Sequence, residues 1–171
     1  DAQGGALVAM EVKTGRVLAC ASYPTFNLET FYEDFATLSQ DPYRPYYNRA
    51  LAAQPPGSVF KMVTSIAAID SGGISRYHEI KDLGKYTFYD TYQPECLIYT
   101  NTGTTHGIIN MMQALSVSCN YYFYEVGRLT GIDAIDQVAK NLGLGEATGI
   151  ELPEDTGHRA NAETKAELYK D

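Results

Sequence analysis

Tryptophan is absent from this 171-residue sequence, cysteine and histidine occur three times each, and no apolar run approaches the roughly 20 residues of a membrane span. Positive charge is also scarce, because 13 Lys and Arg face 21 Asp and Glu, for a net charge of −8. A nucleic-acid-binding protein needs clustered positive charge to meet the phosphates. We therefore expect no nucleic-acid partner. The first residues carry no basic-then-apolar signal pattern, and the length predicts a single globular domain, residues 1–171.

The small number of cysteines limits how many disulfides and metal sites the chain can form. Cys20, Cys96 and Cys119 are too scattered for a disulfide scaffold. No two of them form a C-x-x-C pair, and the histidines stand at no spacing typical of a metal site, so we expect no metal and no other cofactor. One disulfide is still possible, and Cys96 with Cys119 is the pair we favour. The alternative is free buried thiols, which are common.

The first third of the chain combines a hairpin with irregular, tyrosine-rich sequence. Residues 5–23 predict two apolar strands joined by the turn Lys13-Thr-Gly-Arg16, with Gly15 available for a positive φ. A short helix is expected within residues 28–38. Pro55-Pro56-Gly57 then interrupts the chain.

Residues 58–71 predict a helix that begins at Ser58 and ends before Gly72-Gly73. Its apolar residues leave almost no polar face, and a helix of this kind is expected in the middle of a fold, covered on several sides. Further on, residues 74–107 indicate strands and turns, with Lys85–Tyr89 among the strand candidates. Residues 109–143 predict helices with a break near 116–120, and the polar tail 154–171 is expected to form a loop or a fraying end.

Ser58 and Lys61 form an S-x-x-K pattern, and they share one face of the predicted helix. A serine becomes a good nucleophile when a neighbouring base takes its proton. Lys61 is suited to be that base, because apolar surroundings and the positive end of the helix dipole both lower a lysine pKa. The structural alternative is that Ser58 caps the helix and Lys61 extends to solvent. The all-apolar helix and the preceding Pro-Pro-Gly favour the catalytic interpretation.

Ser118-Cys119-Asn120 lies in the break between two helical segments. A serine and an asparagine two residues apart on a tight turn can face one site, where the hydroxyl relays a proton and the amide positions a substrate. Ser and Asn are also common in ordinary turns, so this pattern is informative only together with S-x-x-K.

S-x-x-K followed by S-x-N is the order found in penicillin-binding proteins and serine β-lactamases. Over nearly its whole length the sequence resembles the transpeptidase domain of a class B penicillin-binding protein. The most specific segments are Pro56-Gly-Ser-Val-Phe-Lys61 and Ser118-Cys-Asn120. Further support comes from the segments 13–19, 23–26, 48–50, 106–107, 114–120 and 148–153.

One family motif, K-T-G or K-S-G on a strand beyond S-x-N, does not follow Asn120 in this chain. The only Lys-Thr-Gly is Lys13-Thr14-Gly15, which precedes Ser58 and which turn chemistry alone explains. We assign it no catalytic role. The chain thus resembles a partial domain that ends before the K-T-G strand. We therefore expect it to be acylated slowly or not at all, and to self-associate through apolar surface that the missing strand would cover.

The resemblance implies an α+β fold in which a helical cluster around the Ser58 helix packs on an antiparallel sheet, incomplete at its C-terminal side. It also implies a peptidoglycan D,D-transpeptidase that β-lactams acylate at Ser58. Lys61 would be the base, Ser118 the proton relay and Asn120 the substrate-positioning amide. The implied partners are peptidoglycan stem peptides, β-lactams and other cell-wall synthesis proteins. The implied location is extracytoplasmic, with a membrane anchor in the parent protein outside this sequence.

Two other interpretations remain open. The chain could belong to a D,D-carboxypeptidase or to a relative that hydrolyses or senses β-lactams, which rapid nitrocefin turnover would indicate. It could also be a catalytically incompetent fragment that retains only interaction surfaces.

Overall fold

A computed structural model describes residues 3–169, and these residues form two compact units. The first unit contains the chain up to Gln54 together with Ala147–Gly157. The second unit contains Pro55–Glu146 together with the residues from His158 onward. Within the described residues no helix is long and apolar enough to cross a membrane.

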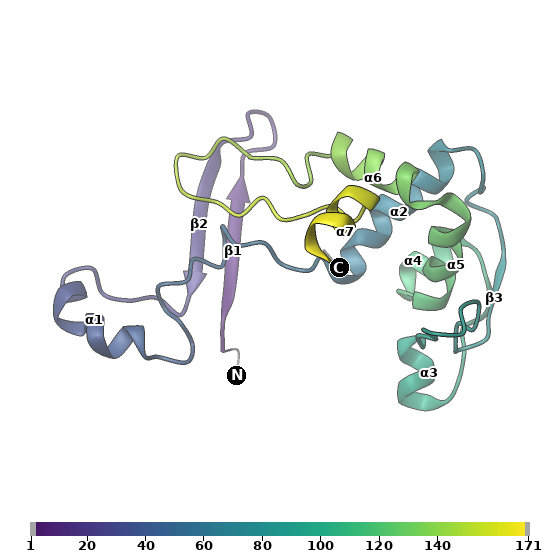
Figure 1. Cartoon of the computed structure of the whole chain (residues 1–171), viewed down its shortest axis with the longest axis horizontal. Coiled ribbons are helices and arrows are strands. Elements are labelled where there is room, and N and C mark those ends of the chain that lie inside the picture. Colours follow the sequence, from purple (N-terminus) through teal and green to yellow (C-terminus); the bar gives the residue numbers. More distant parts are fainter. Residues whose placement is uncertain (1–2, 170–171) are drawn as a thin grey trace. The chain divides into compact units, whose positions relative to one another are not determined.

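The first unit is built on the predicted hairpin (Figure 1). Strand β1, Gly5–Met10, pairs antiparallel with β2, Val17–Tyr23, and Gly15 takes a φ of +74° in the turn between them. Helix α1, Phe31–Ser39, follows within one to three residues of the predicted bounds. The returning segment 147–157 is joined to this unit by a hydrogen bond from the Asp155 N–H to the Leu51 carbonyl. The first unit is therefore built from two segments that lie far apart in the sequence.

The second unit is organised around the Ser58 helix that the sequence predicted. It begins as a 3-10 turn, Gly57–Phe60, and continues as α2, Lys61–Asp70. Contacts with α4, α5 and α6 bury one face of α2, including Val63, Ala67 and Ala68. The expectation that this helix is covered on several sides is wrong for the described residues. Four apolar side chains of the segment are exposed: Val59, Met62, Ile66 and Ile69.

Residues 74–107 contain less strand than predicted. Strand β3, Ile80–Asp82, pairs antiparallel with β4, Gly107–Ile109, and α3, Leu97–Thr102, is a helix that the sequence analysis did not predict. Of the strand expected at Lys85–Tyr89, only Lys85 pairs, in an isolated bridge to Glu95. Aromatic packing, with Tyr86 against α5, holds that segment instead. The high β-propensity of residues 85–89 reflects packing on a half-buried surface, and it does not require a ladder of hydrogen bonds between strands.

The helical region contains α4, Met111–Ser116, α5, Asn120–Thr130, and α6, Ile132–Asn141, with the predicted break before Asn120. The polar tail is not an extended loop, because it includes α7, Ala162–Leu168. The Asn161 side chain caps α7 by accepting a hydrogen bond from the Thr164 N–H. This short helix has no buried face, and it therefore left no periodic pattern in the sequence.

The core of the second unit lies between α2, α5 and the small β3–β4 sheet. Tyr122, Met111, Val126 and Cys119 are almost fully buried in it, and a second cluster joins α2 to α6 through Val63, Ala67, Ile135 and Ala139. Helices and small antiparallel sheets together make the fold α+β, as predicted.

Candidate active site

Ser58 and Lys61 lie where the 3-10 turn passes into α2. Ser58 does not act as a helix cap, since no side-chain capping hydrogen bond is formed at this end. Lys61 is the first residue of α2, and Gly57 just before Ser58 has a φ of +55° that favours glycine. The alternative interpretation, that Ser58 caps the helix, is therefore wrong, and the Ser58 hydroxyl is available for other contacts.

Ser118 and Asn120 flank the start of α5. Ser118 has a φ of +52°, in the left-handed region that costs an L-residue about 1–2 kcal/mol. Cys119 is the N-cap of α5, with its sulfur accepting a hydrogen bond from the Tyr122 N–H, and Asn120 is the first helical residue. A strained serine persists only where its surroundings hold it, and such positions cluster at functional sites.

The structure brings all four predicted site residues into one network of hydrogen bonds. The Lys61 amine donates to the Ser118 carbonyl at 2.7 Å and to the Ser118 hydroxyl at 2.9 Å. It also donates to Oδ1 of Asn120 at 2.7 Å. The Ser118 hydroxyl in turn donates to Oγ of Ser58 at 2.9 Å. Ser118 thus connects the candidate nucleophile to the candidate base.

The surroundings of Lys61 change the pKa of its amine. Burial lowers the pKa of Lys61, and the nearby Cys119 and Cys96 partly oppose that change. Among residues 3–169 no carboxylate forms an ion pair with the Lys61 amine. Its other neighbour of note is the ring of Phe123, whose centroid lies 5.7 Å from Nζ. A lysine with a lowered pKa gives up its proton more readily than an ordinary lysine, and in its neutral form it can accept a proton from a nearby serine hydroxyl.

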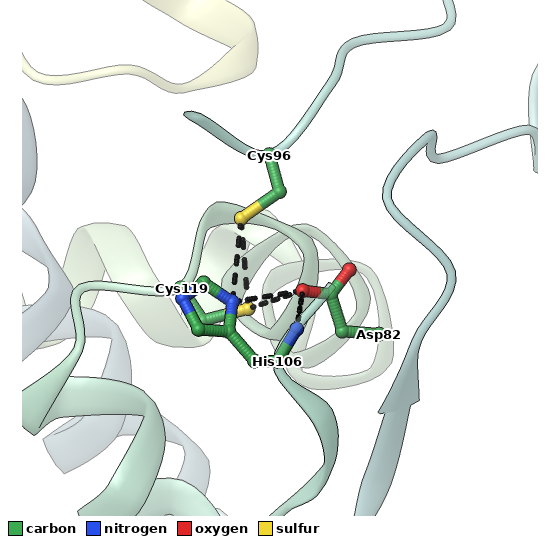
Figure 2. A group of neighbouring side chains, drawn as sticks. All are labelled: Asp82, Cys96, His106 and Cys119. Atoms are coloured by element: carbon green, nitrogen blue, oxygen red, sulfur yellow. Dashed lines mark hydrogen bonds and ion pairs between the residues drawn. The ribbon is translucent and has the colours of Figure 1, made fainter. Parts of the chain in front are cut away.

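A second group of side chains adjoins this network. Asp82, Cys96, His106 and Cys119, here called the donor cluster, point toward one another (Figure 2), and their ligand atoms all lie within 4.8 Å of each other. Asp82 and both cysteines are at most 2% exposed. Burial raises the pKa of the Asp82 carboxyl, but hydrogen bonds from His106 and Gly84 outweigh it and lower that pKa overall. These four side chains are the ones that could hold a metal ion.

The sequence analysis missed the donor cluster because no two of its members have short metal-ligand spacing. Pairing of β3 with β4 sets Asp82 opposite Gly107 and so brings His106 to Asp82. The disulfide favoured between Cys96 and Cys119 is absent: both are free thiols, with sulfurs 3.8 Å apart against about 2.05 Å in a disulfide. The sequence feature that could have pointed to the donor cluster was Cys119, a cysteine placed between Ser118 and Asn120.

Comparison with known proteins shows the family to which the chain belongs. Residues 5–167 match the model of the penicillin-binding protein transpeptidase domain. The chain belongs to this family. The Lys13-Thr14-Gly15 segment of this family member lies in the β1–β2 turn, where the Gly15 N–H donates to the Glu11 carbonyl.

Individual relatives align with almost the whole of this chain. It is 34% identical to the peptidoglycan D,D-transpeptidase MrdA of Acinetobacter baumannii, over 97% of this chain and 25% of that protein. It is 27% identical to PBP2 of Helicobacter pylori, solved in complex with MreC, with a TM-score of 0.85 over 98% of this chain and 32% of the other.

A third similar structure is the imipenem acyl-enzyme complex of penicillin-binding protein A from M. tuberculosis. It is 30% identical, with a TM-score of 0.73 over 88% of this chain and 37% of that one. The present chain spans about a quarter of the length of MrdA.

Proposed function

We propose that this chain carries the acyl-transfer centre of a peptidoglycan D,D-transpeptidase, with Ser58 as the nucleophile. The observation that supports the proposal is the continuous path of hydrogen bonds from Ser58 through Ser118 to Lys61. The curated relatives named D,D-transpeptidase and the acyl-enzyme complex of a similar structure support the same reaction class.

In the proposed reaction, Oγ of Ser58 attacks the carbonyl carbon between the two D-alanines of a stem peptide. The hydroxyl proton passes through Ser118 to the neutral amine of Lys61, so the serine attacks as an alkoxide equivalent. The C–N bond breaks, and the departing D-alanine nitrogen takes a proton back through Ser118. The acyl group stays on Ser58 as an ester. An amine from a neighbouring peptide then attacks that ester and loses a proton to Lys61. The C–O bond to Ser58 breaks, and the Ser58 oxygen takes this proton back through Ser118.

Two further groups would assist this step. The Ser58 N–H lies in the first turn ahead of α2, and an N–H at a helix start is suited to stabilising the developing oxyanion. Asn120 would hold a substrate amide with the part of its side chain that Lys61 leaves free, since Lys61 occupies only Oδ1. Asn120 would thereby couple substrate position to the base.

The partners and the location follow from the same proposal. Stem peptides would be the substrates and β-lactams the covalent inhibitors. Other cell-wall synthesis proteins would be the macromolecular partners, as MreC is for the similar PBP2. The site of action would be outside the cytoplasmic membrane, with the longer protein anchored to it.

Labelling with fluorescent penicillin tests the proposal. We would compare this chain with a chimera that continues into the C-terminal part of A. baumannii MrdA, which would supply the K-T-G strand the family implies. The chimera should label, and Ser58→Ala should abolish the label. The chain alone should label about 10²–10³-fold more slowly than the chimera if the K-T-G strand supplies one oxyanion-hole donor, as the family resemblance implies. Persistent labelling of the folded Ser58→Ala chimera would identify another nucleophile. Rapid nitrocefin turnover would favour a hydrolase.

A further inference from the structure

Ser118 lies at the C-terminal end of α4, in a position that glycine usually occupies. The Ser118 N–H donates to the Leu115 carbonyl at 3.2 Å. The Cys119 N–H donates to the Ala114 carbonyl at 2.9 Å. These two bonds, with the positive φ of Ser118, form a Schellman motif, in which the residue of positive φ is most often glycine. The strained backbone of Ser118 is therefore part of a helix end, and its geometry depends on α4.

α4 is too short to be stable by itself. It contains only six residues, whereas an isolated helix shorter than about 12–15 residues is marginal in water. Of these six residues, Met111 and Ala114 are buried. Because so few side chains hold α4 in the core, the interactions at its two ends contribute much of what keeps it helical.

The start of α4 has a pair of reciprocal hydrogen bonds. Oδ1 of Asn110 accepts from the Gln113 N–H at 3.1 Å, and the Asn110 N–H donates to Oε1 of Gln113 at 3.0 Å. This arrangement is a capping box, which satisfies two N–H groups that a helix start would otherwise leave unpaired. Asn110 directly follows the buried Ile109 at the end of β4, so the capping box fixes where α4 begins relative to that strand.

Backbone hydrogen bonds connect the capping box to the other end of α4. The Ala114 N–H donates to the Asn110 carbonyl at 2.8 Å, and the Ala114 carbonyl accepts from Cys119. The Gln113 carbonyl accepts from the Val117 N–H at 3.0 Å. Each residue of the capping box is thus linked, directly or through one residue, to a neighbour of the strained serine.

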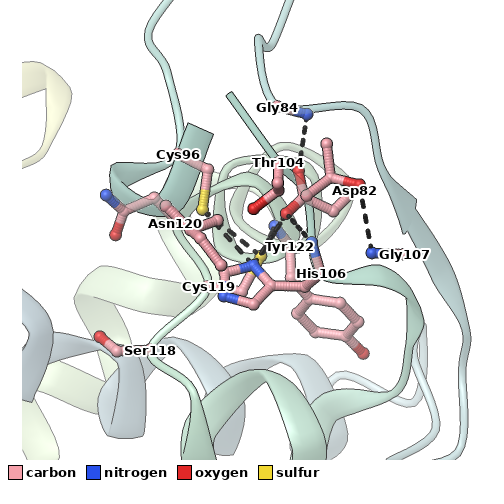
Figure 3. A network of polar contacts seen from close by, with 12 residues as sticks. Asp82, Gly84, Cys96, Thr104, His106, Gly107, Ser118, Cys119, Asn120 and Tyr122 are labelled. Atoms are coloured by element: carbon pink, nitrogen blue, oxygen red, sulfur yellow. Dashed lines mark hydrogen bonds and ion pairs between the residues drawn. The ribbon is translucent and has the colours of Figure 1, made fainter. Parts of the chain in front are cut away.

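The end of α4 presents Ser118 to the candidate active site. Figure 3 shows the Cys119 side chain directed into the donor cluster, while the Ser118 and Asn120 side chains on either side of it point away. The Lys61 amine donates to the carbonyl and to the hydroxyl of Ser118, and that hydroxyl donates to Ser58. A shift in the end of α4 would therefore move the relay hydroxyl. A misplacement of about 1 Å can lower a rate about 100-fold.

We propose that Asn110 and Gln113 are positioning residues for acyl transfer. Their capping box fixes the start of α4, and α4 in turn holds the Ser118 hydroxyl between Lys61 and Ser58. Neither residue takes part in the bond-breaking steps, because both act through the backbone of α4. The purpose of this positioning rests on the proposed function, whereas the effect of the capping box on the Ser118 turn does not.

Backbone hydrogen exchange of residues 117–119 tests the structural link and requires no activity. Gln113→Ala removes one half of the capping box and should speed exchange there by at least about fivefold in the full chain, the effect of a typical lost helix cap. Gln113→Glu keeps an acceptor for the Asn110 N–H and should restore slow exchange. The Gln113 side chain is exposed, so neither variant disturbs the core.

Asn110 and a matched control complete this test. Asn110→Ala should also speed exchange at residues 117–119, whereas Asn110→Ser keeps a capping oxygen and should not. Asn161→Ala removes the same kind of cap from α7, where the Asn161 side chain accepts from the Thr164 N–H. It should leave exchange at residues 117–119 unchanged.

Penicillin acylation of the MrdA chimera tests the purpose of the positioning. At a temperature at which every variant is folded by circular dichroism, Gln113→Ala should lower the limiting rate at saturating penicillin by about 5–100-fold. The half-saturating concentration should change by less than about twofold, because the lost interaction acts on the chemical step. Gln113→Glu should restore the rate, and Asn161→Ala should not change it. A loss of stability alone would not slow acylation in a protein that remains folded.

Two results would overturn the proposal. Unchanged exchange at residues 117–119 in Gln113→Ala would refute the structural link. Faster exchange together with an unchanged limiting acylation rate would refute the positioning. A wild-type chimera that penicillin does not label would contradict the proposed function instead, and the exchange measurements would still decide whether the capping box holds the Ser118 turn.

Discussion

The Lys61 amine lies 2.7 Å from Oδ1 of Asn120, although 59 residues separate them in the sequence. This contact places the start of α2 beside the start of α5, and the Ser118 hydroxyl completes it by bridging to Ser58. Two helix starts thus supply the candidate nucleophile, base, relay and amide. The contact between α2 and α5 is part of the main core of the unit, so the packing that stabilises it also sets the site geometry.

Lys61→Ala should slow penicillin acylation of the MrdA chimera by about 10²–10⁴-fold, the usual contribution of a positioned base. With Lys61 present, the rate should rise with pH around a midpoint below the ordinary lysine value of about 10.4, because burial lowers the pKa of Lys61. Stopped-flow acylation across pH measures both effects.

Lys13→Ala is the matched control, because Lys13 lies in the β1–β2 turn. It should leave acylation unchanged. A loss as large as that of Lys61→Ala, in a protein folded by circular dichroism, would assign a catalytic role to the first Lys-Thr-Gly segment.

A comparison of Ser118→Gly with Ser118→Ala should separate the effect of backbone strain on stability from the effect of the lost hydroxyl on acylation. Both remove the hydroxyl that bridges Lys61 and Ser58, so both should slow acylation of the chimera. Glycine adopts the observed φ of +52° without strain, whereas alanine does not. Ser118→Gly should therefore be about 1 kcal/mol more stable than Ser118→Ala. Urea denaturation measures the difference, and equal stabilities would show that the Ser118 backbone is not strained.

Glu125 should make a pH-dependent contribution to stability. The Arg128 side chain donates two hydrogen bonds to the Glu125 carboxylate, and Tyr86 donates a third at 2.5 Å. The Arg128 hydrogen bonds lower the pKa of Glu125. Its contribution is therefore complete above the ordinary glutamate pKa of about 4.3 and is lost as pH falls through the lower folded-state pKa.

Glu125→Gln should accordingly lower the Tm by about 2–4 °C at pH 7. The difference from wild type should shrink as the pH is lowered below 4. Differential scanning calorimetry at several pH values checks this, and a difference that grows toward acid pH would show that the sign is wrong.

Exposed apolar side chains of the hairpin should promote self-association of this chain. Leu7 is 59% exposed and Leu18 66% exposed, on strands that pair only with each other among the described residues. Unpaired strand edges with apolar side chains favour pairing with another chain. Light scattering should give a mass above 18.8 kDa at high concentration, and Leu7→Lys with Leu18→Lys should reduce it. A monodisperse monomer in the wild type would contradict the prediction.

Much of the local structure and the chemical pattern followed from the sequence alone. The hairpin, the nucleophile helix and the break before Asn120 depend on turn residues and on short-range periodicity, which act between near neighbours. Ser58, Lys61, Ser118 and Asn120 were identifiable because their motifs are short and contiguous. The same local signals gave no indication of α3 or α7, which are short and have no fully buried residues to create a pattern.

Tertiary structure alone decided the contacts between distant segments. The Lys61–Asn120 contact requires α2 to pack on α5. The donor cluster requires β3 to pair with β4, which carries His106 to Asp82 across 24 residues. Such contacts depend on how the faces of helices and strands pack against one another. The secondary-structure propensity of the residues and the spacing of the motifs do not predict that packing. The sequence by itself therefore determined which groups are candidates for catalysis. The fold determined that Cys119 adjoins both the candidate active site and the buried group formed by Asp82, Cys96 and His106.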